Sequence, residues 1–394
     1  MDRNRIKFAI LSISSLLMVS MTASAILADI QVHFAGVDEA IIQMVLTIPA
    51  LLAVFFAFAS GPLSMRIPKK SLVIFGLFSG LTGGMIALIF GSMSIGVLLC
   101  SSVLIGIAQG INSTMTMALI ADLFVGDESG AMMGLQSAVV NGGSMVLVFT
   151  SGFLAGIQWN YSYLVYLAFI PVIMISIRNL PRDAPPAHEE DHTDKSGKLN
   201  ATVFFTALVM FLYRTFLFVY QTNIALLVVS SGYGDASTSG LINTSMSAAG
   251  MVTGILFGRF QRVLKHFTIP VALLISGIGM LLIFSVGTLN ILFIAAICMG
   301  FGMATIMPAG TLMAASAVNA GMRATAIAIT TAAVSLGMFM SPIIMNALSN
   351  SVADGSIAFK FMLSAIGFFS IALMTVAGNK IIVKKQLQSK NMVS

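Results

Sequence analysis

Apolar runs of about 20 residues recur along the whole chain, and shorter polar stretches separate them. The runs lack the strict alternation of apolar and polar residues that marks a half-buried strand, so they predict helices. A helix of about 20 residues is long enough to cross the hydrocarbon core of a bilayer. We therefore predict twelve membrane-spanning helices. They lie near residues 7–29, 39–62, 71–91, 95–122, 131–153, 161–180, 201–231, 238–258, 267–288, 290–313, 323–347 and 356–379.

One longer polar stretch, Pro181 to Asn200, divides these runs into two sets of six. It is rich in proline, acids and lysine, a composition typical of a solvated linker. The pattern predicts an all-α integral membrane protein of two pseudo-symmetric six-helix bundles. Residues 1–180 would form the first bundle, residues 181–200 a cytoplasmic linker, and residues 201–394 the second bundle with a short cytoplasmic tail.

The composition agrees with lipid as the main solvent of the outer surface. Hydrophobic residues make up 58% of the chain and charged residues 9%, whereas a soluble domain carries about 25% charged residues. The basic N-terminus, apolar stretch and Ala23-Ser24-Ala25 also resemble a secretory signal. We favour an uncleaved first helix, because cleavage there would remove the first of many spans.

The net charge of +6 could suggest a nucleic-acid partner. Placing both termini in the cytoplasm, however, puts 18 of the 20 Lys and Arg residues on the cytoplasmic side. The exceptions are Lys360, near the outer end of the last span, and Arg214, inside span seven. This distribution follows the positive-inside rule. It indicates a multi-pass protein of the inner or plasma membrane and requires no nucleic acid.

The residue types needed for catalysis are scarce within the spans. Cys100 and Cys298 lie inside apolar runs, with no disulfide framework or metal-ligand spacing. No Gly-x-x-x-x-Gly-Lys-Ser/Thr loop for ATP occurs, and no span combines a nucleophile with a base. We therefore expect no enzyme activity, no cofactor and no metal, and we expect a monomer.

The two sets of spans repeat a feature of their loops. A glycine ends span two at Gly61 and span eight at Gly258, and an arginine follows four or five residues later, at Arg66 and Arg262. Matching halves indicate a duplicated transporter with its substrate site where the halves meet.

The loop after span two resembles that of the major facilitator superfamily, which carries Gly-x-x-x-Asp-Arg-x-Gly-Arg/Lys-Arg/Lys there. The chain departs from this pattern at Met65 and Pro68. The matching residues are Gly61, Arg66, Lys69 and Lys70. The resemblance covers essentially the whole chain and implies a conformational latch in which Arg66 meets an acid, Asp122, at the cytoplasmic end of span four. The alternative is that these basic residues only set the topology.

Other family motifs are reduced. The glycines of span four, Gly106 and Gly110, lack the arginine found in many relatives. Span five keeps Gly143, Ser151 and Gly152 of a motif associated with antiporters, and span eleven keeps Gly337, Ser341 and Pro342. These losses leave the subfamily and the direction of transport open.

Arg214 is the only strongly charged residue near the middle of a span. A charge at that depth costs about 2.5–3.5 kcal/mol on insertion scales, so it calls for a reason. Tyr213 and Tyr220 are seven residues apart, as are Arg214 and Gln221, which places the four on one polar stripe. The resemblance points this helix at a central cavity, so we expect Arg214 to neutralise an anionic substrate group. The alternative is that Arg214 pairs with carbonyls or an acid and serves packing.

Other polar residues at mid-depth are weaker candidates, because such side chains more often bond neighbouring helices. Gln109 and Asn112, on one face of span four, are the best pair. The others are Asn141, Asn243, Ser247, Thr331 and Ser335. Asp29, near the outer end of span one, is a candidate proton or gate residue.

The sequence thus predicts a secondary transporter that works by alternating access. Its substrate would be a small organic anion or an amphipathic molecule with an anionic group, with lipid, and protons or a counter-anion, as further partners. One alternative is a proton-coupled multidrug efflux antiporter, and another is a non-transporting receptor on a transporter scaffold.

Overall fold

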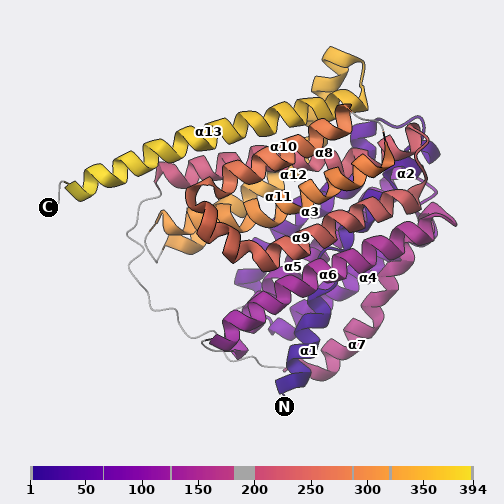
Figure 1. Cartoon of the computed structure of the whole chain (residues 1–394). Coiled ribbons are helices and arrows are strands. Elements are labelled where there is room, and N and C mark those ends of the chain that lie inside the picture. The colour runs from indigo at the N-terminus through magenta and orange to yellow at the C-terminus, as the bar shows by residue number, and fades with distance from the viewer. Residues whose placement is uncertain are drawn as a thin grey trace. The chain divides into compact units, whose positions relative to one another are not determined.

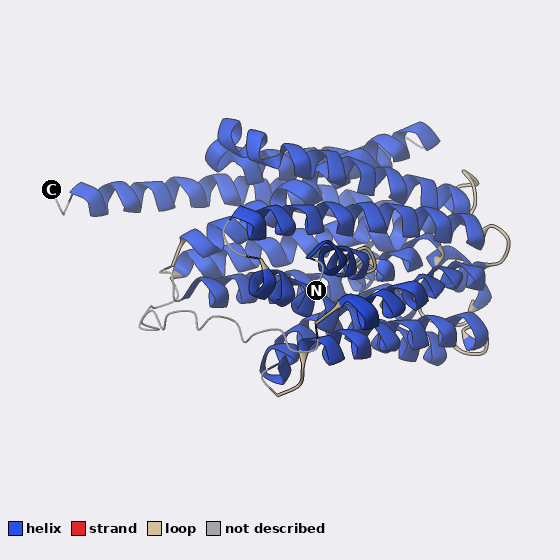
Figure 2. Ribbon diagram, turned by 90° about the horizontal axis from the view of Figure 1, so that it is seen from below, coloured by secondary structure: helices blue, strands red, loops and turns tan. Residues whose placement is uncertain are grey.

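The computed structural model describes residues 3–64, 66–124, 127–181, 200–285, 288–318 and 322–391, and all regular structure in these segments is helical (Figures 1 and 2). Residues 182–199 of the predicted linker lie outside the described residues. By length and apolar composition, twelve helical segments of the described chain can cross a membrane. The predicted fold class is confirmed.

The helices follow the predicted spans closely. The first six spans are formed by α1 (Arg3–Ser14) with η1 (Val19–Ala25), α3 (Glu39–Ser64), α4 (Lys69–Phe90), α5 (Ile95–Leu123), α6 (Asp127–Ala155), and η2 (Trp159–Ala168) with α7 (Phe169–Asn179). The short helix α2 (Leu27–His33) lies just beyond the first span. The other six are formed by α8 (Ala201–Ser230), α9 (Ala236–Leu264), η3 (Lys265–Phe267), α10 (Thr268–Ser285), α11 (Leu289–Ser316), α12 (Arg323–Ala353) and α13 (Ile357–Asn391).

The first span departs from the prediction, because it is not one helix. The α-helix ends at Ser14, and a 3-10 helix follows over Val19–Ala25. Near this end the hydroxyls of Ser12, Ser14 and Ser15 donate to backbone carbonyls three or four residues earlier, at 2.8–2.9 Å. Such back-bonding bends helices. A 3-10 segment of seven residues is unusually long and often marks a hinge.

The predicted loop after span eight is also wrong. The segment from Gly258 to Leu264 continues helix α9, and the chain turns only at Lys265, whose φ is 50°. Helix α3 likewise runs past Gly61, to Ser64, so neither glycine ends its helix as expected.

The described helices form two compact units. Unit 1 contains Met1–Asp191 and Gln221–Ala248, and unit 2 contains His192–Tyr220 and Ala249–Ser394. Helices α8 and α9 thus each contribute one part to unit 1 and one part to unit 2. The two-bundle boundaries at residues 180 and 201 stay a prediction.

Unit 1 is held by close helix crossings at glycine. Helix α5 packs against α3 and α4. A Cβ built on Gly110 would lie 2.4 Å from the carbonyl oxygen of Ala53, and one built on Gly106 would lie 2.9 Å from that of Pro49. Small residues four apart allow such backbone contact between membrane helices. Gly106 and Gly110, found above as a reduced family motif, therefore act here as a packing surface.

Unit 2 packs α10 against α11 and α13, and α11 against α12. Helix α8 approaches α12 at Gly337, where an added Cβ would lie 2.4 Å from the carbonyl oxygen of Phe211 and 3.2 Å from Cβ of Arg214. Ser341 of α12 donates a hydrogen bond to the carbonyl of Thr215, at 2.6 Å. These contacts fix the middle of α8, which carries the polar stripe.

Candidate functional site

The polar stripe lies on one unbroken helix, α8, and is buried along its length. The exposed fractions are 0% for Tyr213, 4% for Arg214, 0% for Tyr220 and 6% for Gln221. Arg214 lies near the middle of the 30-residue helix. Thr215 beside Arg214, and Thr222 and Asn223 beside Gln221, add further buried polar groups to this part of α8.

Arg214 has no hydrogen-bond partner or ion pair among the described residues. Its Nε and Nη1 atoms are buried without an acceptor. The guanidinium carbon lies 5.5 Å from the centre of the Phe218 ring, a cation–π contact. The alternative in which Arg214 pairs with a carbonyl or an acid is therefore not seen in the part of the chain that the structure describes.

The hydroxyls of Tyr213 and Tyr220 are also buried without a hydrogen-bond partner among the described residues. Each buried polar group left unpaired costs about 1–3 kcal/mol, and more when it is charged. An anion would accept hydrogen bonds from the guanidinium and offset that cost, and hydrogen bonds to a charged partner are the stronger kind. The guanidinium of Arg214 therefore offers donors that an anion could use.

A second polar group lies in unit 1, where Gln109 and Asn112 line a small cavity beside the break in span one. Gln109 Oε1 accepts a hydrogen bond from Ser20 at 2.9 Å. Asn112 is 3% exposed, and its Oδ1 has no partner among the described residues. The cavity has room for about one water molecule, so it is too small for an organic substrate in this conformation.

Four of the weaker candidates, Asn141, Asn243, Ser247 and Thr331, donate hydrogen bonds within the protein. Asn141 donates to the carbonyl of Ser137, one turn earlier on α6, at 2.9 Å. Asn243 of α9 donates to Ser24 of η1 at 3.2 Å. Ser247 and Thr331 donate to carbonyls one turn earlier on their own helices. Nothing in these contacts points to a substrate.

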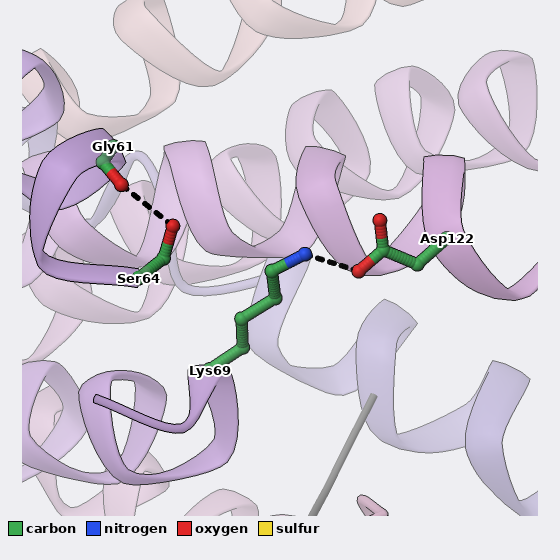
Figure 3. A network of polar contacts seen from close by, with 4 residues as sticks. All are labelled: Gly61, Ser64, Lys69 and Asp122. Atoms are coloured by element: carbon green, nitrogen blue, oxygen red, sulfur yellow. Dashed lines mark hydrogen bonds and ion pairs between the residues drawn. The ribbon is translucent and has the colours of Figure 1, made fainter. Parts of the chain in front are cut away.

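The expected latch residues are present, but the ion pair is a different one. Asp122 of α5 pairs with Lys69 of α4, and both side chains are largely buried, at 2% and 13% exposed (Figure 3). Arg66 lies exposed in the turn before α4. The expected contact between Arg66 and Asp122 is therefore corrected: Lys69 takes that place, because it begins α4 and α4 packs along α5.

Neighbouring contacts tie further helices together at the same end of unit 1. Lys70 donates to the carbonyls of Ile177 and Leu180, at the end of α7, at 2.6 and 2.8 Å. Arg3 and Lys7 of α1 both pair with Glu128 of α6, at 2.6 and 2.8 Å. We call this end, which carries the basic residues, the basic end of unit 1.

Breaking the buried pair should weaken unit 1. We expect Asp122→Asn to lower the free energy of unfolding by about 3 kcal/mol, because it leaves the Lys69 ammonium buried without its counter-charge. Lys69→Met combined with Asp122→Asn should cost less than Asp122→Asn alone. Thermal unfolding in detergent measures both, with Arg66→Gln as the exposed control. Equal losses for Arg66→Gln and Asp122→Asn would contradict this assignment.

Asp29 lies beyond the first apolar span, on the short helix α2, at the end of unit 1 opposite the basic end. It is half-buried, and its Oδ2 atom is buried with no partner among the described residues.

Sequence reasoning missed several buried polar residues. Gln43 of α3 is fully buried and donates to Glu39, at 2.6 Å, and to Asn223, at 3.3 Å. Lys360 of α13 is also fully buried. The sequence does show Gln43 as a lone amide within an apolar run. It also shows Lys360 as a basic residue near the outer end of the last span, away from the cytoplasmic side where most basic residues lie.

The fold is shared with solved transporter structures. The structure of the POT family transporter PepTSo aligns with 96% of this chain and over 98% of its own length, with a TM-score of 0.75 and 12% sequence identity. A bacterial homologue of the human lysosomal transporter Spinster, in an inward-facing conformation, aligns over 96% of each chain, with a TM-score of 0.71 and 14% sequence identity. The human organic anion transporter MFSD10 (TETRAN) aligns with 95% of this chain and over 100% of its own length, with a TM-score of 0.67 and 14% sequence identity. At these identities the likeness concerns the fold.

Sequence comparison points the same way at the level of the family. Among curated proteins, no sequence matches the chain significantly. The family model of the Major Facilitator Superfamily matches residues 8–222 and residues 202–386. Together the two matches span nearly all of the twelve helical segments. The chain is therefore a multi-pass membrane protein that belongs to the major facilitator superfamily.

Proposed function

We propose that the chain is a secondary transporter of small organic anions, and that Arg214 provides the counter-charge for the substrate. One observation carries this proposal: the buried guanidinium of Arg214 has two nitrogen atoms without an acceptor among the described residues. Tyr213 and Tyr220 add two buried hydroxyls without a partner there. A carboxylate, or another oxyanion, is the ligand that would accept hydrogen bonds from the guanidinium of Arg214.

The substrate class follows from the neighbourhood of Arg214. The guanidinium packs on Phe218, and Tyr213 contacts Phe368, with 5.9 Å between ring centres. Such surroundings favour an anion with an apolar body over a strongly hydrated inorganic ion. We therefore propose amphipathic monoanions as the preferred substrates. MFSD10, a solved neighbour, is an organic anion transporter by name, but at 14% identity the proposal for this chain rests on Arg214.

Alternating access would move the anion from one side of the membrane to the other. In the proposed orientation the basic end of unit 1 lies in the cytoplasm, as the positive-inside rule predicts. The pair of Lys69 and Asp122 would then act as a cytoplasmic latch that holds α4 and α5 together. The latch role is part of the proposal, with Arg66 in an accessory position.

This site favours exchange of one anion for another over net transport, because net transport requires the protein to reorient with Arg214 unoccupied. Without an anion, Arg214 is a buried charge with no counter-charge among the described residues, a costly state for a reorienting protein. With an anion bound, the charge is compensated. We therefore expect counterflow to be faster than net efflux.

A panel of ligands of one size and different charge tests the proposal. Benzoate, benzamide and benzylamine share one apolar body, so their effects on the melting temperature of the purified protein differ by charge. We expect benzoate, and longer aromatic carboxylates more strongly, to raise the melting temperature. Stabilisation by benzylamine with none by the carboxylates would contradict the anion role and favour the multidrug antiporter. Binding of carboxylates without flux would favour the receptor.

A further inference from the structure

Helix α12 crosses α8, within unit 2, at the turn that carries Arg214. A Cβ built on Gly337 of α12 would lie 2.4 Å from the carbonyl oxygen of Phe211 and 3.2 Å from Cβ of Arg214. Ser341, one turn later on α12, is fully buried and donates to the carbonyl of Thr215 at 2.6 Å. One turn of α12 thus contacts α8 on both sides of Arg214.

The hydroxyl of Thr215 belongs to the same crossing. It lies 2.9 Å from the carbonyl oxygen of Phe211, on its own helix, and 3.4 Å from the carbonyl oxygen of Gly337. Two hydroxyls, one from each helix, therefore reach backbone carbonyls where α8 and α12 cross. Hydrogen bonds between membrane helices contribute only about 0.6 kcal/mol each on average. Their directions, however, fix the rotation and the register of α8 against α12.

The other helices of unit 2 meet α8 at side chains. An added Cβ on Gly310 of α11 would lie 2.4 Å from the sulfur of Met210, and one on Gly378 of α13 would lie 2.5 Å from the ring of Phe205. The end of a side chain can move aside, whereas backbone cannot. Among the described glycines of unit 2 that approach α8, Gly337 is the one that meets its backbone. Helix α12 therefore locates this turn of α8 more strictly than α11 and α13 do.

We propose that Gly337 and Ser341 are positioning residues for Arg214, which set where its guanidinium meets the substrate without touching the substrate themselves. The side chain of Arg214 leaves α8 beside Gly337, and its guanidinium carbon lies 5.5 Å from the centre of the Phe218 ring. The stem thus runs from the crossing with α12 to the next turn of α8. In the proposed function, on which this inference rests, that guanidinium binds the anion.

The position of the guanidinium matters because its N–H groups form a rigid planar fork. A binding group must be held within about 0.5 Å of its productive position. A methyl group at Gly337 would press on the backbone of α8 and on the stem of Arg214, so this turn of α8 must shift. We therefore expect weaker anion binding in a protein that keeps its charge at this site.

The guanidinium can be observed without any anion, by nuclear magnetic resonance of the protein labelled with isotopically enriched arginine. The buried Nε–H of Arg214 should give a signal that exchanges slowly with water, and Arg214→Met identifies this signal by its loss. We expect Gly337→Ala and Ser341→Ala each to shift the signal or to speed its exchange.

Two matched controls make the same substitutions elsewhere in unit 2. Gly378→Ala crowds α8 near its start, at the ring of Phe205. Ser276→Ala removes a hydroxyl on α10 that is fully buried and bonds to a carbonyl of its own helix, at 3.0 Å. Neither control should change the Arg214 signal.

Titration of the melting temperature with benzoate measures the effect on binding. Gly337→Ala should weaken the apparent affinity by about tenfold, the equivalent of one lost hydrogen bond to a charged group. Ser341→Ala should weaken it less. The two controls should keep the affinity of the parent protein, even where they lower the melting temperature without ligand. A loss of affinity that merely follows a loss of stability would appear in the controls as well.

An unchanged Arg214 signal in both α12 variants would overturn the proposal, and so would equal losses of affinity in the controls. Ser341→Ala only removes an atom, so it decides the question should Gly337→Ala fail to fold. The two proposals can fail separately. A shifted signal in a protein that binds no carboxylate would contradict the transport proposal alone. Carboxylate binding that needs Arg214 but is unaffected by both substitutions on α12 would contradict the positioning role alone.

Discussion

Replacing Arg214 with methionine should raise the melting temperature of the ligand-free protein and abolish its stabilisation by organic anions. The guanidinium is 4% exposed, with two nitrogen atoms unpaired among the described residues. Removing a buried unpaired charge and filling its volume with an apolar side chain should stabilise the fold by about 1–3 kcal/mol. The same change removes the counter-charge for the substrate, so it should weaken anion binding by about tenfold to a hundredfold. Thermal unfolding with and without a carboxylate measures both effects.

Two further variants separate charge from packing. Arg214→Lys keeps the charge but loses the planar fork, so it should retain weak anion binding. Arg262→Gln removes an exposed arginine at the end of α9, so it should change neither the stability nor the binding. A methionine variant that is less stable than the parent protein would show that Arg214 has a structural partner, as the packing alternative holds.

Adding one methyl group at Gly143 should destabilise the protein strongly, whereas adding it at Gly142 should not. A Cβ on Gly143 would lie 2.3 Å from the carbonyl oxygen of Ser15, where span one leaves the α-helix. Overpacking of this kind costs about 1–3 kcal/mol, and backbone cannot move aside as a side chain can. A Cβ on Gly142 meets nothing within 4 Å, so Gly142→Ala should be neutral or gain up to about 1 kcal/mol from helix propensity.

Thermal unfolding of the two alanine variants measures this difference directly, because they add the same group to adjacent positions of α6. Equal melting temperatures would mean that α6 does not press on the break in span one. Gly143 then would not be a packing residue, and its place in the reduced family motif would need another reason.

The helices could be predicted from the sequence because hydrophobic length is a local property. Spans such as 39–62 and 95–122 match Glu39–Ser64 and Ile95–Leu123 within two residues at each end. The stripe on α8 was also predictable, since residues seven apart share a face of any continuous helix. Its burial agrees with that expectation: all four members are at most 6% exposed.

What the sequence could not provide were contacts between helices. The pairing of Asp122 with Lys69 in place of Arg66 depends on how α4 begins and how it packs on α5. The break in span one depends on serine hydroxyls and on contact with Gly143. A hydropathy average along the sequence detects neither the ion pair nor the break.

Arg214 would hold the substrate and make the loaded form cheaper to reorient than the empty one.

Counterflow in proteoliposomes tests the central claim most directly. Vesicles loaded with an unlabelled aromatic carboxylate at high concentration are diluted into a trace of the same labelled compound, and the label inside is followed over time. We predict transient accumulation of label with the parent protein and with Arg262→Gln, and none above protein-free vesicles with Arg214→Met. Undiminished counterflow in Arg214→Met, or counterflow of a matched amine in place of the carboxylate, would contradict it.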